Sequence, residues 1–387
     1  MARRLGLVLT GGGARAAYQA GVLKAMAEWL PHRAHNPFPV ICGSSAGALN
    51  AATLAINARH FHQGVQYLLE VWKNFRVSDV YRTDAPGVFA NSVRWFAGLL
   101  LSGFGIRLGT RESLLDNRPT ARLLEQILPC EKIQASIDAG MLHALAITAS
   151  GYASGESVTF YQGVPEIAPW KRARRIGLPT QIGLKHLLAS TAIPFLFPPV
   201  RVNREYFGDG SMRQIAPISA ALHTGATRVL VIGIRHAPEQ PRQNQISEYP
   251  SLAQVAGHAL DTIFLDALEV DLERIQRINR TLELIPEERR KEADLQHVDV
   301  LVIAPSVSIA QIAEQHAGRL PWTIRLLLRL IGAMRRGGSN LVSYLLFDKA
   351  FCRALIDLGY QDATQRKAEI LAFLDASDEQ PAPGFPQ

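Results

Sequence analysis

Two short apolar runs near the N-terminus, each followed by a turn of small residues and a helical pattern, constrain the fold more than any other feature. Residues 5–9 are apolar and lead directly into the glycines of 11–13 and a helical periodicity over 16–30. The same order of strand, small-residue turn and helix recurs over residues 39–57. Such repeated alternation is typical of α/β folds with largely parallel strands.

The rest of the chain continues this alternation. A long amphipathic helix is expected over 251–280, and several more helices over 320–374. Further strand candidates are residues 142–149, 157–161, 228–234 and 298–303. We therefore predict an α/β fold whose largely parallel sheet is sandwiched by helices, with a C-terminal helical extension.

Size, charge and cysteine content narrow the classes of protein. With 387 residues and a hydrophobic content of 48%, the chain can bury a large core by itself. A formal net charge of +7 is too mild at this length to indicate a nucleic-acid partner. The three cysteines are far apart and lack metal-ligand spacing, so neither a disulfide framework nor a zinc site is expected.

The sequence also bears on the compartment. The apolar run at 5–9 is too short for the apolar region of a signal peptide. The longest uncharged stretch, 36–58, contains Pro37, Pro39 and several polar residues, so we interpret it as buried strand, turn and helix. We therefore expect a cytoplasmic protein.

The turn at 43–47 fits the pattern G-x-S-x-G, with Gly43 and Gly47 each two residues away from Ser45. In this pattern a serine sits on a sharp turn between a strand and a helix. Small neighbours are needed because the backbone there is strained and closely approached, and the helix start stabilises developing negative charge. Ser45 is therefore the candidate nucleophile, whereas the adjacent Ser44 is expected to be structural.

The first glycine run has more than one interpretation. As G-x-G-x-x-A after a strand it resembles a dinucleotide fingerprint, which needs an acidic residue about twenty positions later. No such acid occurs, because the second strand ends at Cys42 and continues into the serine turn. The alternative is that the amides of Gly11, Gly12 and Gly13 lie near Ser45 and donate hydrogen bonds to an oxyanion. An ordinary tight turn without a ligand stays open as well.

Four blocks taken together carry a resemblance to a known family. In chain order they are Gly-Gly-Gly-Ala-Arg at 11–15, Gly-Ser-Ser-Ala-Gly at 43–47, Ala-Ser-Thr-Ala-Ile-Pro-Phe-Leu-Phe-Pro-Pro-Val at 189–200 and Phe-Gly-Asp-Gly-Ser at 207–211. Their sequences and order resemble the signature blocks of the patatin-like phospholipase family over roughly residues 5–222. The resemblance implies a serine acyl hydrolase that cleaves acyl esters of lipids without a cofactor or a metal.

The resemblance also implies roles for single residues. It implies a dyad without histidine, in which Ser45 is the nucleophile, Asp209 is the general base and Gly210 belongs to the dyad turn. It implies an oxyanion hole formed by Gly11, Gly12, Gly13 and Arg15. The family commonly has glycine where this chain has Ala16, and glycine or alanine where it has Ser211. These departures put substrate preference in question more than activity.

The proposed base needs a suitable environment. A serine hydroxyl is a poor nucleophile until a group within hydrogen-bond reach accepts its proton. A free aspartate has a pKa of about 3.9 and is only weakly basic, so partial burial of Asp209 is expected to raise its basicity. Since aspartate before glycine is usually only a turn former, the assignment of Asp209 depends on the ordered family blocks.

On this basis we divide the chain into four parts. They are a catalytic domain over 5–222, a continuation of the α/β core with a long helix over 223–305, a helical extension over 306–378, and a disordered tail over 379–387. Within the first part, the irregular stretch 75–117 is expected to be either a lid or surface insertion, or a packed helix.

Two other functions stay open at this stage. An α/β-hydrolase would need a Ser-Asp-His triad, for which the candidate histidines are His223, His236, His258, His297 and His316. A catalytically silent lipid-binding protein would use residues 320–336, where Arg325 and Arg329 stand among leucines as on a helix that contacts the anionic inner face of a membrane. A core helix with a solvated edge explains the same pattern. No motif indicates the head group, the acyl chain length or the oligomeric state.

Overall fold

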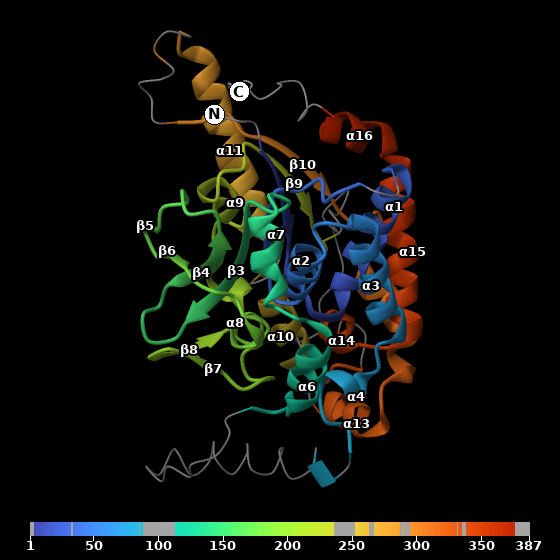
Figure 1. Ribbon diagram of the computed structural model, residues 1–387. Helices are drawn as coiled ribbons and strands as arrows, with labels where there is room; N and C mark the ends of the chain where they lie inside the picture. Colours follow the sequence, from blue (N-terminus) through green and yellow to red (C-terminus); the bar gives the residue numbers. More distant parts are fainter. Residues whose placement is uncertain are drawn as a thin grey trace.

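A mixed β-sheet forms the centre of the molecule (Figure 1). The computed structural model describes residues 4–31, 34–84, 86–87, 113–235, 252–262, 267–286, 289, 295–330, 332–334 and 338–375. The main strand order within this part of the chain is β10-β9-β1-β2-β3-β4-β6-β5, and the pair β7–β8 joins the sheet at β3. The strands are β1 Leu5–Leu9, β2 Val40–Ser44, β3 Ala144–Gly151, β4 Ser157–Gly163, β5 Trp170–Arg172, β6 Arg175–Pro179, β7 Val200–Val202, β8 Glu205–Gly208, β9 Arg228–Ile232 and β10 Asp299–Ile303.

The half of the sheet from β10 to β3 is parallel. Its central strands β1, β2 and β9 are buried along their whole length, as parallel strands covered on both faces must be. The register pairs Leu9 with Gly43 and Ser44 with Thr148, so the carboxyl ends of β1, β2 and β3 meet at one edge. In sheets of this kind, ligands bind at that edge. The predicted α/β fold with a largely parallel sheet is confirmed.

The other half of the sheet is more mixed than the sequence analysis expected. Strand β4 runs antiparallel to β3, β6 is parallel to β4, and the pairs β5–β6 and β7–β8 are antiparallel. The sequence analysis predicted β3 and β4 but none of the four strands β5 to β8. These strands have only three to five residues and are partly exposed, so they lack the apolar run that identifies a buried strand.

Helices cover both faces of the sheet. Alternation along β1 directs Leu7 into a core shared with α1, α2, α3 and α15, and Val8 into a second core shared with α9 and α11. The helices are α1 Ala17–Trp29, α2 Ala46–Ile56, α3 Phe61–Asn74, α4 Val77–Val80, α6 Arg118–Ile127, α7 Lys132–Asp138, α8 Leu184–Ser190, α9 Ser219–His223, α10 Leu252–Asp261, α11 Ala267–Leu284, α12 Ile309–His316, α13 Trp322–Leu330, α14 Ser339–Leu345, α15 Lys349–Gln365 and α16 Lys367–Asp375.

The C-terminal helices pack on the N-terminal ones, as Figure 1 shows for α15 along α1. Gly21 of α1 lies against the backbone of Ile356, and Gly359 of α15 lies against the carbonyl of Tyr18, so neither position has room for a Cβ. The Tyr18 hydroxyl donates a hydrogen bond to Oδ2 of Asp362 at 3.0 Å. The extension therefore shares one core with the N-terminal part of the sheet.

Some expectations lie partly or wholly outside the described residues. Of the helix expected over 251–280, the structure describes α10 and α11, and residues 263–266 between them lie outside the described residues. Of the irregular stretch 75–117, residues 85 and 88–112 are not described, and the tail expected over 379–387 also lies outside the described residues. Among the described helices, none is long and apolar enough to cross a membrane.

Candidate active site

Ser45 occupies the sharp turn between β2 and α2. Its backbone has φ 52° and ψ −131°, a conformation that costs a non-glycine residue energy and is concentrated at functional sites. The Ser45 N–H donates to Oγ of Ser190 at 3.0 Å, and the Ser190 hydroxyl donates to the carbonyl of Thr148 at 2.6 Å. Through Ser190, the carboxyl end of β3 fixes the strained turn.

The two glycines of the turn are required by close packing. A Cβ at Gly43 would lie 2.5 Å from the carbonyl oxygen of Gly47, and a Cβ at Gly47 would overlap the carbonyl of Leu9. The turn is therefore pressed against the end of β1, immediately before the first glycine run. This contact explains both fixed glycines of the G-x-S-x-G pattern.

Asp209 follows β8 and is fully buried. Its Oδ1 accepts the N–H of Ser211 at 2.9 Å, and its own N–H donates to the carbonyl of Ala192 at 2.8 Å. The next residue, Gly210, lies so close to the carbonyl of Thr148 that no Cβ fits there. Ser45, through Ser190, and Asp209, through Gly210, are thus both positioned by the backbone of Thr148.

Burial raises the pKa of the Asp209 carboxyl from its ordinary value to about 7. Hydrogen bonding with Ser45 and Ser211 opposes this effect but is weaker. Oδ2 of Asp209 is buried and accepts no hydrogen bond of normal geometry within the described structure. The contact with the Ser45 hydroxyl is therefore looser than a fully formed hydrogen bond, as is common for catalytic pairs without substrate.

The first glycine run stands beside the serine turn. Gly13 begins a short 3₁₀ helix, Gly13–Ala16, and lines the same cavity as Ser45. The N–H groups of Gly12 and Gly13 have no acceptor in the described part of the chain, as expected at a helix N-terminus. Both amides are therefore available to a bound oxyanion. The N–H of Gly11 likewise has no acceptor among the described residues, so Gly11 stays a candidate beside them.

Arg15 is placed differently. Its N–H donates to the carbonyl of Gly12, and its buried guanidinium donates to Ser343, Asp261 and Asn340 in the C-terminal helices. The structure therefore does not bring the Arg15 side chain to the Ser45 hydroxyl. Its contacts instead connect the glycine run to α10 and α14.

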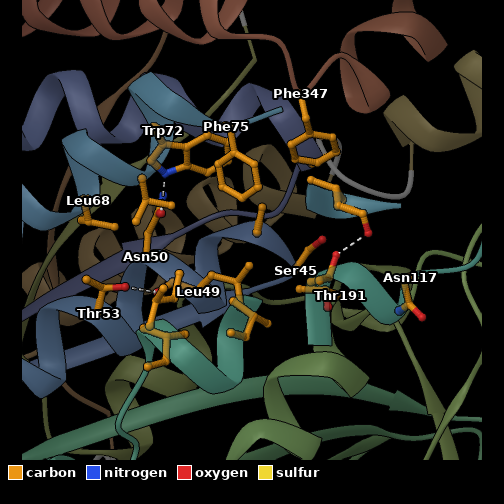
Figure 2. A pocket seen from close by; sticks show the side chains of 18 of the residues that line it. Ser45, Leu49, Asn50, Thr53, Leu68, Trp72, Phe75, Asn117, Thr191 and Phe347 are labelled. Carbon is orange, nitrogen blue, oxygen red and sulfur yellow. Dashed lines mark hydrogen bonds between the residues drawn. The ribbon is translucent and has the colours of Figure 1, made fainter. Parts of the chain in front are cut away.

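An apolar cavity opens from Ser45 (Figure 2) and encloses about 780 Å³, counted with its open mouth. Figure 2 shows Asn117 at one end and Leu68 and Thr53 at the other, with Ser45 between them. Three aromatic rings form one wall, with centroids 5.3 to 6.4 Å apart: Trp72, Phe75 and Phe347. The cavity has the largely apolar lining of a small-molecule site.

Comparison with known proteins decides the family. A family model, Patatin-like phospholipase, matches residues 7–222, which is more than half of the chain. The chain belongs to the patatin-like phospholipase family. The resemblance seen in the four sequence blocks is thereby confirmed. Members of this family are generally serine lipid acyl hydrolases.

Solved structures give only distant likenesses. VipD from Legionella pneumophila has 13% sequence identity and a TM-score of 0.35, covering 97% of this chain and 67% of that chain. Human GIVD cytosolic phospholipase A2 in complex with methyl gamma-linolenyl fluorophosphonate has 13% identity and a TM-score of 0.44, covering 97% of this chain and 59% of that chain. A comparison with curated proteins found no match. Likenesses this weak carry no argument about activity.

The structure describes four of the five candidate histidines of a triad, and none of these four is brought to the serine of this patatin-like domain. Among the described residues that line the cavity containing Ser45, none is a histidine. His223 stacks on Trp170, with centroids 4.8 Å apart, and His316 packs edge-on against Phe351. His258 and His297 are exposed, and His236 lies outside the described residues.

Sequence reasoning missed two parts of the site. Ser190 lay within the third family block, but nothing in its sequence context showed that it would hold the serine turn. The aromatic wall was missed because Trp72 and Phe347 are far apart in sequence and meet only in the fold. The amphipathic pattern of 61–74 was the one available signal that α3 turns an apolar face inward.

If Asp209 is the general base of an ester hydrolysis, its raised pKa predicts how the rate depends on pH. A general base must be ionised to accept a proton, so kcat/KM should fall about tenfold per pH unit below 7 and level off above it. The measurement is a pH profile of kcat/KM for a soluble butyryl ester between pH 5 and 9. A midpoint near pH 4 would contradict the effect of burial on this carboxyl.

Proposed function

We propose that the chain hydrolyses acyl ester bonds of lipids, with Ser45 as nucleophile and Asp209 as general base. The observation that carries the proposal is that the strained serine lines an apolar cavity, beside a fully buried carboxylate of raised pKa. An apolar cavity accommodates an acyl chain, and the serine is then next to the ester bond.

The reaction follows from the positions of these groups. The Ser45 hydroxyl transfers its proton to Asp209 as Oγ bonds to the ester carbonyl carbon. The resulting oxyanion accepts hydrogen bonds from the N–H groups of Gly12 and Gly13, and each such donor lowers the barrier by about 3 kcal/mol. The C–O bond breaks and the leaving alcohol takes the proton from Asp209. Water, deprotonated by Asp209, then releases the fatty acid, and Ser45 regains its proton.

Substitution of Ser45 tests the proposal directly. Ser45→Ala should abolish release of fatty acid from a phospholipid panel, because no other group can form the acyl-enzyme. Mass spectrometry of the released fatty acids measures this and reports the preferred lipid. The matched control is Ser44→Ala, which removes the neighbouring hydroxyl and should keep most of the activity. Undiminished hydrolysis by Ser45→Ala would contradict the proposal.

The geometry of α2 supports an acyl chain lying along the cavity. Ser45, Leu49 and Thr53 all line the cavity and are four residues apart, so they lie along one face of the helix. With a rise of 1.5 Å per residue, Leu49 is about 6 Å and Thr53 about 12 Å along the axis from the nucleophile. The two side chains therefore mark successive depths of the proposed acyl site.

Bulky substitutions at these depths should shorten the accepted chain in steps. Leu49→Trp should lower kcat/KM for octanoyl and palmitoyl esters by roughly tenfold to a hundredfold, whereas Thr53→Trp should affect only the palmitoyl ester. The butyryl ester serves as the internal control, since its hydrolysis reports whether each variant is folded. Equal losses with all three esters would mean that the acyl chain lies elsewhere.

We propose further that the enzyme docks on anionic membranes through α13. Three large apolar side chains of this helix, spaced four residues apart, are exposed by 62%, 51% and 78%: Trp322, Leu326 and Leu330. The opposite face is buried through Ile324 and Leu328. Arg325 and Arg329 accompany the exposed row, and residues 315–347 contain no acidic residue. An apolar row with basic neighbours suits an anionic lipid surface.

The position of α13 connects this surface with the cavity. The Thr323 hydroxyl donates to the carbonyl of Thr83 at 2.9 Å, shortly after α4, and Val80 of α4 lines the cavity. Figure 1 shows α13 beside α4. Docking through α13 would therefore bring lipid close to the residues that surround the proposed acyl site, on the inner face of the membrane if the protein is cytoplasmic.

Vesicle binding tests the docking surface. Leu326→Ser/Leu330→Ser should weaken co-sedimentation with phosphatidylglycerol vesicles roughly tenfold or more, and Arg329→Gln about fivefold. The matched control is Val270→Ser/Leu284→Ser, which removes two comparably exposed apolar side chains from α11 and should leave binding unchanged. Equal loss in the control pair, or equal binding to neutral phosphatidylcholine vesicles, would argue against docking through α13.

A further inference from the structure

We infer that two helices beyond residue 222, α10 and α14, complete the active site by holding the first glycine run, with Arg15, Asp261 and Tyr344 as positioning residues for the oxyanion donors. The inference rests on the proposed function. Asp261 belongs to α10 and Tyr344 to α14, and both lie outside residues 7–222, which the family model matches. The site is thus assembled from two distant parts of the chain.

The N–H groups of the Arg15 guanidinium donate hydrogen bonds to residues of α10 and α14. Nε donates to Oγ of Ser343 at 2.8 Å, Nη1 to Oδ1 of Asp261 at 3.2 Å and Nη2 to the carbonyl of Asn340 at 3.3 Å. The same group lies over the ring of Tyr344, 4.0 Å from its centroid. Three hydrogen bonds and the contact with the Tyr344 ring together hold the Arg15 side chain in one orientation.

Asp261 is itself held in place. Its Oδ1 also accepts the hydroxyl of Tyr344 at 2.9 Å, and its Oδ2 accepts the side-chain amide of Asn340. The side chain of Arg15 is only 5% exposed, so its charge depends on Asp261 for compensation. Loss of that carboxylate would leave a buried cation without its ion-pair partner, which a folded chain relieves by moving the cation.

Movement of Arg15 would displace the oxyanion donors, which are the N–H groups of Gly12 and Gly13. Arg15 is two residues after Gly13, and its N–H donates to the carbonyl of Gly12 at 3.2 Å. Gly13, with φ +56°, packs on the carbonyl of Tyr344 so closely that a Cβ would overlap it. Phe347, shortly after α14, lines the cavity together with Ser45. The amides of Gly12 and Gly13 are therefore placed by α14 on one side and by Arg15 on the other.

A positioning role predicts a loss in turnover rather than in substrate binding. Asp261→Asn and Tyr344→Phe should lower kcat for a soluble butyryl ester about tenfold to a hundredfold, with KM changed less than about twofold. The matched control is Asp299→Asn, which removes an acidic partner from another buried arginine, Arg228, in the sheet and should leave kcat unchanged. An unchanged kcat in Asp261→Asn, or a loss confined to KM, would overturn the inference.

A double variant separates positioning from stability. Arg15→Met/Asp261→Asn removes the buried cation together with its partner, so its unfolding temperature should recover relative to Asp261→Asn alone. Its kcat should stay low, because the connection between the glycine run and the C-terminal helices is still missing. If kcat of the double variant recovers along with its stability, then Arg15, Asp261 and Tyr344 only stabilise the fold and do not position the oxyanion donors.

Hydrogen–deuterium exchange tests the same inference without any activity. The amides of residues 14–18 should exchange faster in full-length Asp261→Asn than in the wild type, and at the wild-type rate in Asp299→Asn. Unchanged exchange in Asp261→Asn would overturn the inference even if the enzyme is active. If Asp261→Asn exchanges faster but the wild-type protein hydrolyses no ester, the positioning role of Arg15, Asp261 and Tyr344 is supported and the proposed function is refuted.

Discussion

The carbonyl of Thr148, the last residue of β3 that pairs with β2, is the point on which the geometry of the site depends. It accepts the hydroxyl of Ser190, which in turn accepts the N–H of Ser45. The same carbonyl packs against Gly210, immediately after Asp209. One backbone carbonyl of a central strand thus positions both the strained turn and the buried carboxylate, although these come from distant segments of the chain. Placement on a rigid sheet keeps such a pair in register where loops alone would not.

Burial of Asp209 makes its carboxylate more basic and also lowers the stability of the folded protein at neutral pH. Its raised pKa means that the ionised form is disfavoured by folding, a destabilisation that is absent well below pH 4 and fully present above about pH 7. The protein therefore gives up stability at neutral pH for a carboxylate basic enough to act alone. In the proposed mechanism this basicity replaces the histidine of a triad.

Much of the fold and part of the site followed from the sequence, for physical reasons that differ between elements. Strands β1 and β2 are buried on both faces and read as plain apolar runs, so they were predicted closely. The turn at Ser45 between β2 and α2 was predicted because such a turn tolerates only small neighbours. Ser190, the aromatic wall and the partners of Arg15 were not found, because their roles arise from contacts between segments that are up to 328 residues apart. Strands β5 to β8 are too short and too exposed to carry a pattern.

The central claim is that Ser45 reacts because buried Asp209 accepts its proton. The most direct measurement is the rate at which a long-chain fluorophosphonate labels the intact chain, with the modified residue located by peptide mass spectrometry. The account predicts one adduct, on Ser45, formed more slowly as the pH falls through about 7 and nearly absent in Asp209→Asn. An adduct on another residue, or labelling of Asp209→Asn at the wild-type rate, would contradict it.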